Sequence, residues 1–146
     1  MLDSFSAVDN EKPKDELIFD PKDHLTSLCA NGRIQISTYA DIKYKGGWSE
    51  IVEEMIKSIS CHPIEIKSLH QDFGLLYVGF ESYGKHQEVK VWRAISRAQI
   101  RSKETCSLCG NNGRPRIHGE KLVIICQKCI HKVEKNGETG TWLDKY

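Results

Sequence analysis

The stretch CSLCGNNGRPRIHGEKLVIICQKC, from Cys106 to Cys129, decides how the C-terminal part of this 146-residue chain folds. It contains two Cys-x2-Cys pairs, Cys106 with Cys109 and Cys126 with Cys129, separated by sixteen residues. A gap of two residues lets both sulfurs of a pair reach the same ion, and this overall spacing is typical of four-thiolate zinc sites. The sequence therefore predicts one zinc ion (Zn2+) per chain.

The predicted ion is structural rather than catalytic. Four thiolates close the tetrahedral shell of zinc, whereas catalytic zinc keeps one position open for water or substrate. His118 and His131 lie nearby in the sequence, but either would have to displace a cysteine from a complete set. A tight turn at Gly110 forms a knuckle that contains Cys106 and Cys109, and a strand leads into Cys126. Cys129 could lie in the first turn of a helix, which gives the order knuckle, hairpin, helix. This order resembles the treble-clef and zinc-ribbon classes of zinc finger.

The remaining sequence predicts an intracellular, cytoplasmic protein. Residues 1–16 contain no secretory signal, and the longest apolar runs have the length of strands, so we expect no membrane partner. Reduced thiols fit this compartment. The two other cysteines, Cys29 and Cys61, are expected to be small core residues.

The first half of the chain predicts a short tail followed by two helices. Residues 1–16 lack periodic apolar positions and are expected to form a mobile tail. Asp20 as N-cap and Pro21 at the first helical position favour a helix over residues 21–30. Residues 32–47 alternate like a strand at their start and otherwise look like a loop. Apolar residues at helical spacing predict a second helix over residues 48–60.

The next elements predict an α+β class. Residues 64–69 and 75–81 have the alternation of two antiparallel strands around a polar turn, and residues 86–103 have helical periodicity. The inner face of that helix is expected to carry Val91, Trp92, Ile95 and Ala98. We expect one small α+β domain of helices and a β-hairpin over residues 17–103, followed by a four-cysteine zinc-finger module with a C-terminal tail over residues 104–146.

Basic residues gather in the second half of the sequence. Residues 1–84 contain eight Lys or Arg and fourteen Asp or Glu, whereas residues 85–135 contain twelve and four. Lys90, Arg93, Arg97 and Arg101 should form a basic ridge along one face of the helix. Arg114 and Arg116, in the loop between the two cysteine pairs, could extend it. These six residues are the candidate contacts for nucleic acid or another partner. The ridge could bind nucleic-acid phosphates, or its arginines could pair with acidic residues such as Glu50, Glu53 and Glu54.

A family resemblance covers about residues 48–129. The matching residues are Gly47, Trp48, Ile64, Ile66, Phe73, Gly74, Leu75, Tyr77, Cys106, Cys109, Gly110, Gly113, Cys126 and Cys129. This pattern resembles small zinc-binding proteins of bacteria and their phages, and the resemblance implies a bacterial or mobile-element setting without fixing a function. The segment HQDFGLLY departs from the more basic segment typical of those proteins, which weakens the case for anion binding by this hairpin.

Three functions follow as hypotheses. The leading one is a non-enzymatic protein that regulates or inhibits a macromolecular partner, such as a host defence or nucleic-acid-processing complex. The second is nucleic-acid binding through Arg93, Arg97 and Arg101. The third is a reduced HNH-like nuclease, although His118 lacks the acidic neighbour and the second histidine of those enzymes. The sequence leaves the oligomeric state open.

Overall fold

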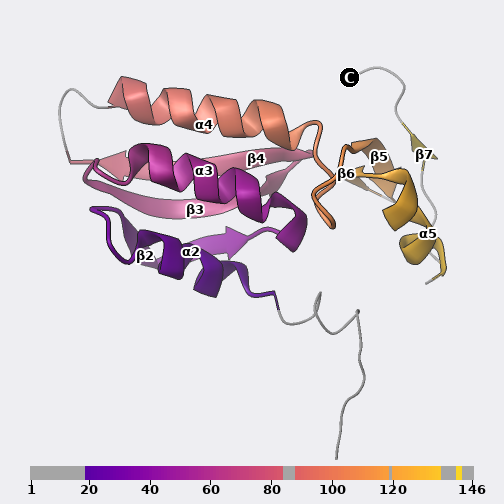
Figure 1. Ribbon diagram of the computed structural model, residues 1–146, viewed down its shortest axis with the longest axis horizontal. Helices are drawn as coiled ribbons and strands as arrows, with labels where there is room; N and C mark the ends of the chain where they lie inside the picture. Colours follow the sequence, from indigo (N-terminus) through magenta and orange to yellow (C-terminus); the bar gives the residue numbers. More distant parts are fainter. Residues whose placement is uncertain (1–18, 84–87, 119, 136–140, 143–146) are drawn as a thin grey trace, which may run out of the picture.

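The α+β class is confirmed. The computed structural model describes residues 19–83, 88–118, 120–135 and 141–142, so the predicted tail over residues 1–16 lies outside the described residues. A three-stranded sheet has the order β2 (Gln35–Lys43), β3 (Ile64–Asp72), β4 (Leu75–Ser82). Three helices cover one face of this sheet (Figure 1): α2 (Pro21–Cys29), α3 (Ser49–Ile59) and α4 (Glu88–Ser102). Among the described helices, none has both the length and the apolar character needed to span a membrane.

Strand β2 is longer than the sequence indicated, and it changes the topology. Residues 35–43 form one strand that pairs in parallel with β3, and α3 connects the two. The predicted loop over most of residues 32–47 is therefore wrong. Only Ile42 is buried among the nine residues of β2, and the register shifts between Ile36 and Asp41. These two features hide the regular alternation by which a strand is recognised.

The predicted helices and hairpin are confirmed within a few residues. Helix α2 begins at Pro21, and the side chain of Asp20 accepts hydrogen bonds from the backbone N–H groups of Lys22 and Asp23 at 3.0 and 3.4 Å. A short 3-10 helix, η2 (Gly46–Trp48), precedes α3. Strands β3 and β4 pair in antiparallel fashion, as expected.

The core lies between the helices and the sheet. Trp48, Ile56, Ile66 and Leu76 are among its fully buried side chains. On α4 the inner positions belong to Val91, Ala94, Ile95 and Ala98, whereas Trp92 is 50% exposed, so its expected inward position is wrong. Cys29 is buried in this core as expected, but Cys61 is exposed, which corrects the prediction for the second cysteine.

The C-terminal part shows the expected order of knuckle, hairpin and helix. Strands β5 (Arg114–His118) and β6 (Lys121–Ile125) form an antiparallel hairpin, and β7 (Thr141–Trp142) pairs with β5. Helix α5 (Gln127–Lys135) follows. The buried cluster of this part consists of Cys106, Ile125, Cys126, Cys129 and Ile130. Ile124 belongs to the main core, so the division at residues 103 and 104 stays a prediction.

The knuckle around Cys106 packs directly on the start of α3. The backbone N–H of Gly47 donates a hydrogen bond to the carbonyl of Ser107 at 2.9 Å, and the indole Nε1–H of Trp48 donates to the carbonyl of Thr105 at 3.0 Å. A Cβ atom at Gly47 would lie 2.2 Å from the carbonyl oxygen of Cys106 and 2.4 Å from the carbonyl carbon of Ser107. Only glycine fits at this position, because the obstacles are backbone atoms that no rotamer change can remove.

Gly47→Ala is expected to destabilise the protein. The added methyl group forces α3 and the knuckle apart, so the free energy of unfolding should fall by about 2 kcal/mol or more and the melting temperature should drop by several degrees. Gly46→Ala is the matched control, since its Cβ would meet only the ring of Phe19 at 3.7 Å, an ordinary contact. Thermal and urea unfolding of both variants measures the difference; equal stabilities would contradict the proposed contact.

Candidate metal centre

The first cysteine pair lies on a tightly hydrogen-bonded knuckle. The backbone N–H of Cys106 donates to the carbonyl of Asn111 at 2.7 Å, and the N–H of Gly110 donates to the carbonyl of Cys106 at 2.9 Å. Gly110 has a φ of 87°, a left-handed conformation that strongly favours glycine. The turn therefore holds Cys106 and Cys109 on the same side of the loop.

The second pair is positioned by the start of α5. Cys126 directly precedes the helix, and Cys129 lies in its first turn, as the sequence predicts. The N–H of Ile130 donates to the carbonyl of Cys126 at 3.1 Å, which starts the helical hydrogen bonding. This geometry turns both thiols of the pair toward the knuckle.

The four cysteines form one cluster that can hold a metal ion. The Sγ atoms of Cys106, Cys109, Cys126 and Cys129 all lie within 4.8 Å of one another. Four sulfurs bound tetrahedrally to zinc at about 2.3 Å would be separated by roughly 3.8 Å. The Sγ atoms of Cys109 and Cys126 are 3.5 Å apart, too far for a disulfide, whose S–S bond is about 2.05 Å long. The residues present therefore fit a tetrahedral metal.

The thiols of this cluster differ in acidity. Burial raises the pKa of Cys106, and burial together with the neighbouring Cys106 raises the pKa of Cys129. Burial also acts against ionisation of Cys126, but the backbone hydrogen bond at Cys129 and the neighbouring thiols outweigh it and lower the pKa of Cys126 to about 7. One thiolate therefore forms readily, and its negative charge disfavours the next. A cation at the centre removes this repulsion.

The two histidines near the cysteines do not alter the predicted ligand set. His131 is exposed on α5 and does not belong to the four-cysteine cluster. His118 ends β5, and its side chain lies outside what the structure describes, so its role in a nuclease stays a prediction.

The predicted basic ridge is only partly available to a ligand. Lys90, Arg93 and Arg97 are exposed on α4, but Arg101 forms an ion pair with Glu54 on α3. That pair supports the alternative in which arginines contact the acidic first half. On β5, Arg114 is exposed, whereas Arg116 is only 6% exposed and adds little to the basic surface.

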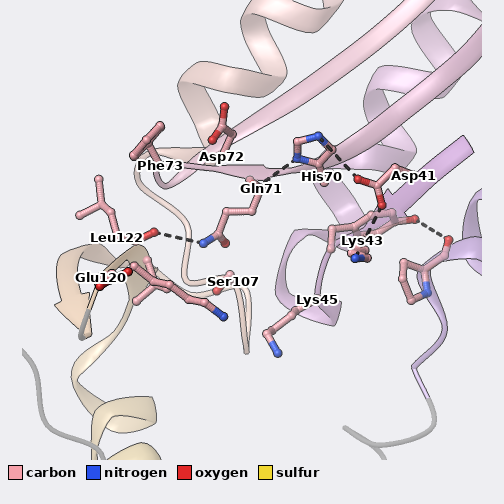
Figure 2. Close-up of a pocket in the computed structure, with 14 residues that line it drawn as sticks. Asp41, Lys43, Lys45, His70, Gln71, Asp72, Phe73, Ser107, Glu120 and Leu122 are labelled. Atoms are coloured by element: carbon pink, nitrogen blue, oxygen red, sulfur yellow. Dashed lines mark hydrogen bonds and ion pairs between the residues drawn. The ribbon is translucent and has the colours of Figure 1, made fainter.

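A cleft of about 630 Å³ lies between the main sheet and the cysteine module (Figure 2). Lys43, Lys45 and His70 line it, and Asp41 lies 3.9 Å from the ammonium nitrogen of Lys43 and 4.0 Å from Nε2 of His70. The side-chain amide of Gln71 crosses to the module and donates to the carbonyl of Leu122 at 3.2 Å. Sequence reasoning missed this cleft, because only the parallel pairing of β2 and β3 brings Lys43 beside His70.

Phe73 at the tip of the β3–β4 hairpin also lines the cleft, in an unusual backbone conformation. Its φ is 51°, in the left-handed region, where a bulky residue is rare, and its side chain is 75% exposed. Phe73 and Leu122 both line the cleft, and Figure 2 labels the two side chains. A strained, exposed aromatic residue contributes little to folding stability, so Phe73 is a candidate contact for a ligand or partner. The sequence signal was the Phe-Gly pair between two strands.

The chain was compared with protein-family models, curated proteins and solved structures, and nothing matched. The resemblance to small zinc-binding proteins of bacteria and phages therefore stays a prediction.

The affinity of the cluster for a divalent metal is expected to rise with pH between about pH 6 and pH 8. The raised pKa values of Cys106 and Cys129 mean that both thiols still carry protons in this range, and these protons must leave when the ion binds. Competition titrations with a chelator, and calorimetry in buffers of different ionisation enthalpy, measure the effect. Cys61→Ser should behave like the wild type; an affinity independent of pH would contradict the prediction.

Phe73→Asn is expected to stabilise the protein by about 1 kcal/mol, because asparagine accepts the left-handed conformation more readily than phenylalanine. The lost contacts are few, since the ring is mostly exposed. Tyr39→Asn is the matched control: Tyr39 is 94% exposed on β2, and its φ is not positive, so no gain is expected. Urea unfolding compares the two variants. Equal or lower stability of Phe73→Asn would show that the turn is not strained.

Proposed function

We propose that this protein is a non-enzymatic regulator that binds a macromolecular partner, and that one structural zinc ion at the four cysteines holds its C-terminal module in place. The observation that carries the proposal is the cluster of four Sγ atoms within 4.8 Å, next to the close contact between the knuckle and Gly47. The ion would therefore fix a contact on which α3 depends.

Two features support a structural rather than a catalytic ion. Four cysteines complete the usual coordination of zinc, which leaves no position for a substrate. Among the residues whose burial the structure describes, the buried cluster of the module consists of three of these cysteines and two isoleucines, with Leu108 and Val123 packed against it. So small an apolar cluster cannot stabilise the module alone, whereas zinc binding to such sites contributes on the order of 10 kcal/mol.

A protein partner is favoured over nucleic acid. The ion pair of Arg101 with Glu54 and the burial of Arg116 remove two of the six predicted basic contacts. The exposed cations that remain on α4 are interspersed with apolar side chains, among them Trp92 and Ile100. The resemblance to proteins of bacteria and phages suggests a host defence or nucleic-acid-processing complex as the setting of that partner.

Metal removal tests the proposal. Elemental analysis should find one zinc per chain, and chelation should expose the backbone amide of Gly47 to hydrogen exchange, because the hydrogen bond to Ser107 depends on the knuckle. Cys129→Ser should have the same effect, and Cys61→Ser, which changes an exposed cysteine outside the cluster, should have none.

Three results would contradict the proposed function. Well under one zinc per chain would exclude the structural ion. Unchanged exchange at Gly47 after chelation would show that the ion does not support α3. Cleavage of DNA or RNA that needs a divalent metal and is lost in His118→Ala would make the protein an enzyme.

A further inference from the structure

We propose that the outer face of α4, formed by Val89, Trp92, Ser96 and Ile100, is the docking surface for an acidic, amphipathic helix of a protein partner. This inference rests on the proposed function, since it names the surface and the class of partner. The three apolar side chains of this face are 62, 50 and 58% exposed, in chain order. Their spacing of three and eight residues places them along one side of the helix.

The attachment of α4 to the core comes mainly from the other side of the helix. The opposite side of the helix carries Val91, Ala94, Ile95 and Ala98, all buried against α3 and the sheet. Figure 1 shows α4 along one edge of the molecule, with its outer side away from the other labelled elements. Isolated exposed apolar residues are common, but several large ones along one side of a surface helix are typical of an interaction site.

The shape of the outer face suits another helix. Together with Arg93 and Arg97 it lines a shallow groove of about 480 Å³ that lies wholly on α4. The stripe from Val89 to Ile100 extends about 16 Å, or three helical turns. Ser96 lies in its middle, and this small side chain lets a second backbone approach closely. Trp92 forms one wall, held by its ring contact with Phe80 on β4, with centroids 5.0 Å apart.

The charges beside the groove select an acidic partner. Residues 89–103 contain five Lys or Arg and no Asp or Glu. Among the described residues, none forms an ion pair with Lys90, Arg93 or Arg97, whereas Arg101 already contacts Glu54. Carboxylates on a partner helix would pair with these three cations while its apolar side contacts the groove.

The same features disfavour the two other classes of occupant. A second copy of the chain that docked through the same face would place its own Arg93 and Arg97 near these arginines. Nucleic acid needs a row of cations along its phosphates and flat surfaces for its bases. Two cations, Arg93 and Arg97, and a single aromatic ring, that of Trp92, line this groove, and its ends are aliphatic, at Val89 and Ile100.

Selection from a displayed library of random 16-residue peptides on the zinc-loaded, full-length protein tests the inference. We expect the enriched peptides to carry apolar residues at helical spacing, with Asp or Glu beside them. Trp92→Ala and Arg97→Glu should each weaken their binding at least about tenfold, as measured by fluorescence anisotropy. A peptide in which the contacting Glu is replaced by Lys should regain affinity for Arg97→Glu.

Two matched control variants change similar residues away from α4. Tyr39→Ser removes an aromatic side chain that is 94% exposed on β2, and Arg33→Glu reverses an exposed arginine. Both should bind the selected peptides like the wild type. Circular dichroism and thermal unfolding confirm that all variants are folded, so a loss of binding is not a loss of structure.

Several outcomes would overturn the inference. The inference is wrong if no peptide is enriched, if the enriched peptides lack acidic residues, or if Trp92→Ala and Arg97→Glu leave their binding unchanged. Arg97-dependent binding of a single-stranded oligonucleotide would assign the face to nucleic acid. A dimer in sedimentation that Trp92→Ala abolishes would assign it to self-association. None of these results changes the zinc content or the exchange at Gly47, so the proposed structural role of the ion is judged separately.

Discussion

The close contact between Gly47 and the cysteine knuckle is the constraint on which the rest of the structure depends. The carbonyl groups of Cys106 and Ser107 in the knuckle lie against Gly47, directly before α3. The first N–H groups of a helix have no partner within the helix, so they need acceptors of this kind. No side chain caps this helix start, and the N–H of Gly47 bonds to the carbonyl of Ser107 instead. Helix α3 in turn connects the parallel strands β2 and β3. This one pair of backbone segments therefore joins the cysteine module to the helix that connects the strands of the sheet.

The parts of the structure that depend on local spacing could be predicted from the sequence. The two Cys-x2-Cys pairs predicted the cluster of four cysteines, and the periodicity of the apolar residues predicted the helices. Strand β2 could not be recognised fully, because only Ile42 among its residues is buried and the register is irregular. The cleft that contains His70 and Phe73 depends on that strand, so it was missed with it. The ion pair between Arg101 and Glu54 joins two helices and has no local signal.

Helix α4 shows why periodicity alone gives an incomplete account of a helix. Trp92 and Ala94 lie on opposite flanks of the buried stripe, and the sequence favoured the larger apolar residue for the inner face. In the structure the small Ala94 faces the core, and Trp92 turns outward against Phe80. Close packing of α4 on α3 and β4 requires a small residue at the inner position. The larger side chain is consequently left on the surface, where it gives the helix a second apolar side.

The hydrogen bond between Trp48 and Thr105 joins residues that are 57 positions apart in the sequence. During synthesis from the N-terminus, α3 leaves the ribosome long before the residues that complete its first turn. The start of α3 therefore lacks these hydrogen-bond partners until Thr105 and Ser107 have been synthesised. If the four cysteines bind the proposed ion, the final folding of the start of α3 is coupled to metal binding, which needs all four cysteines and so follows the synthesis of Cys129.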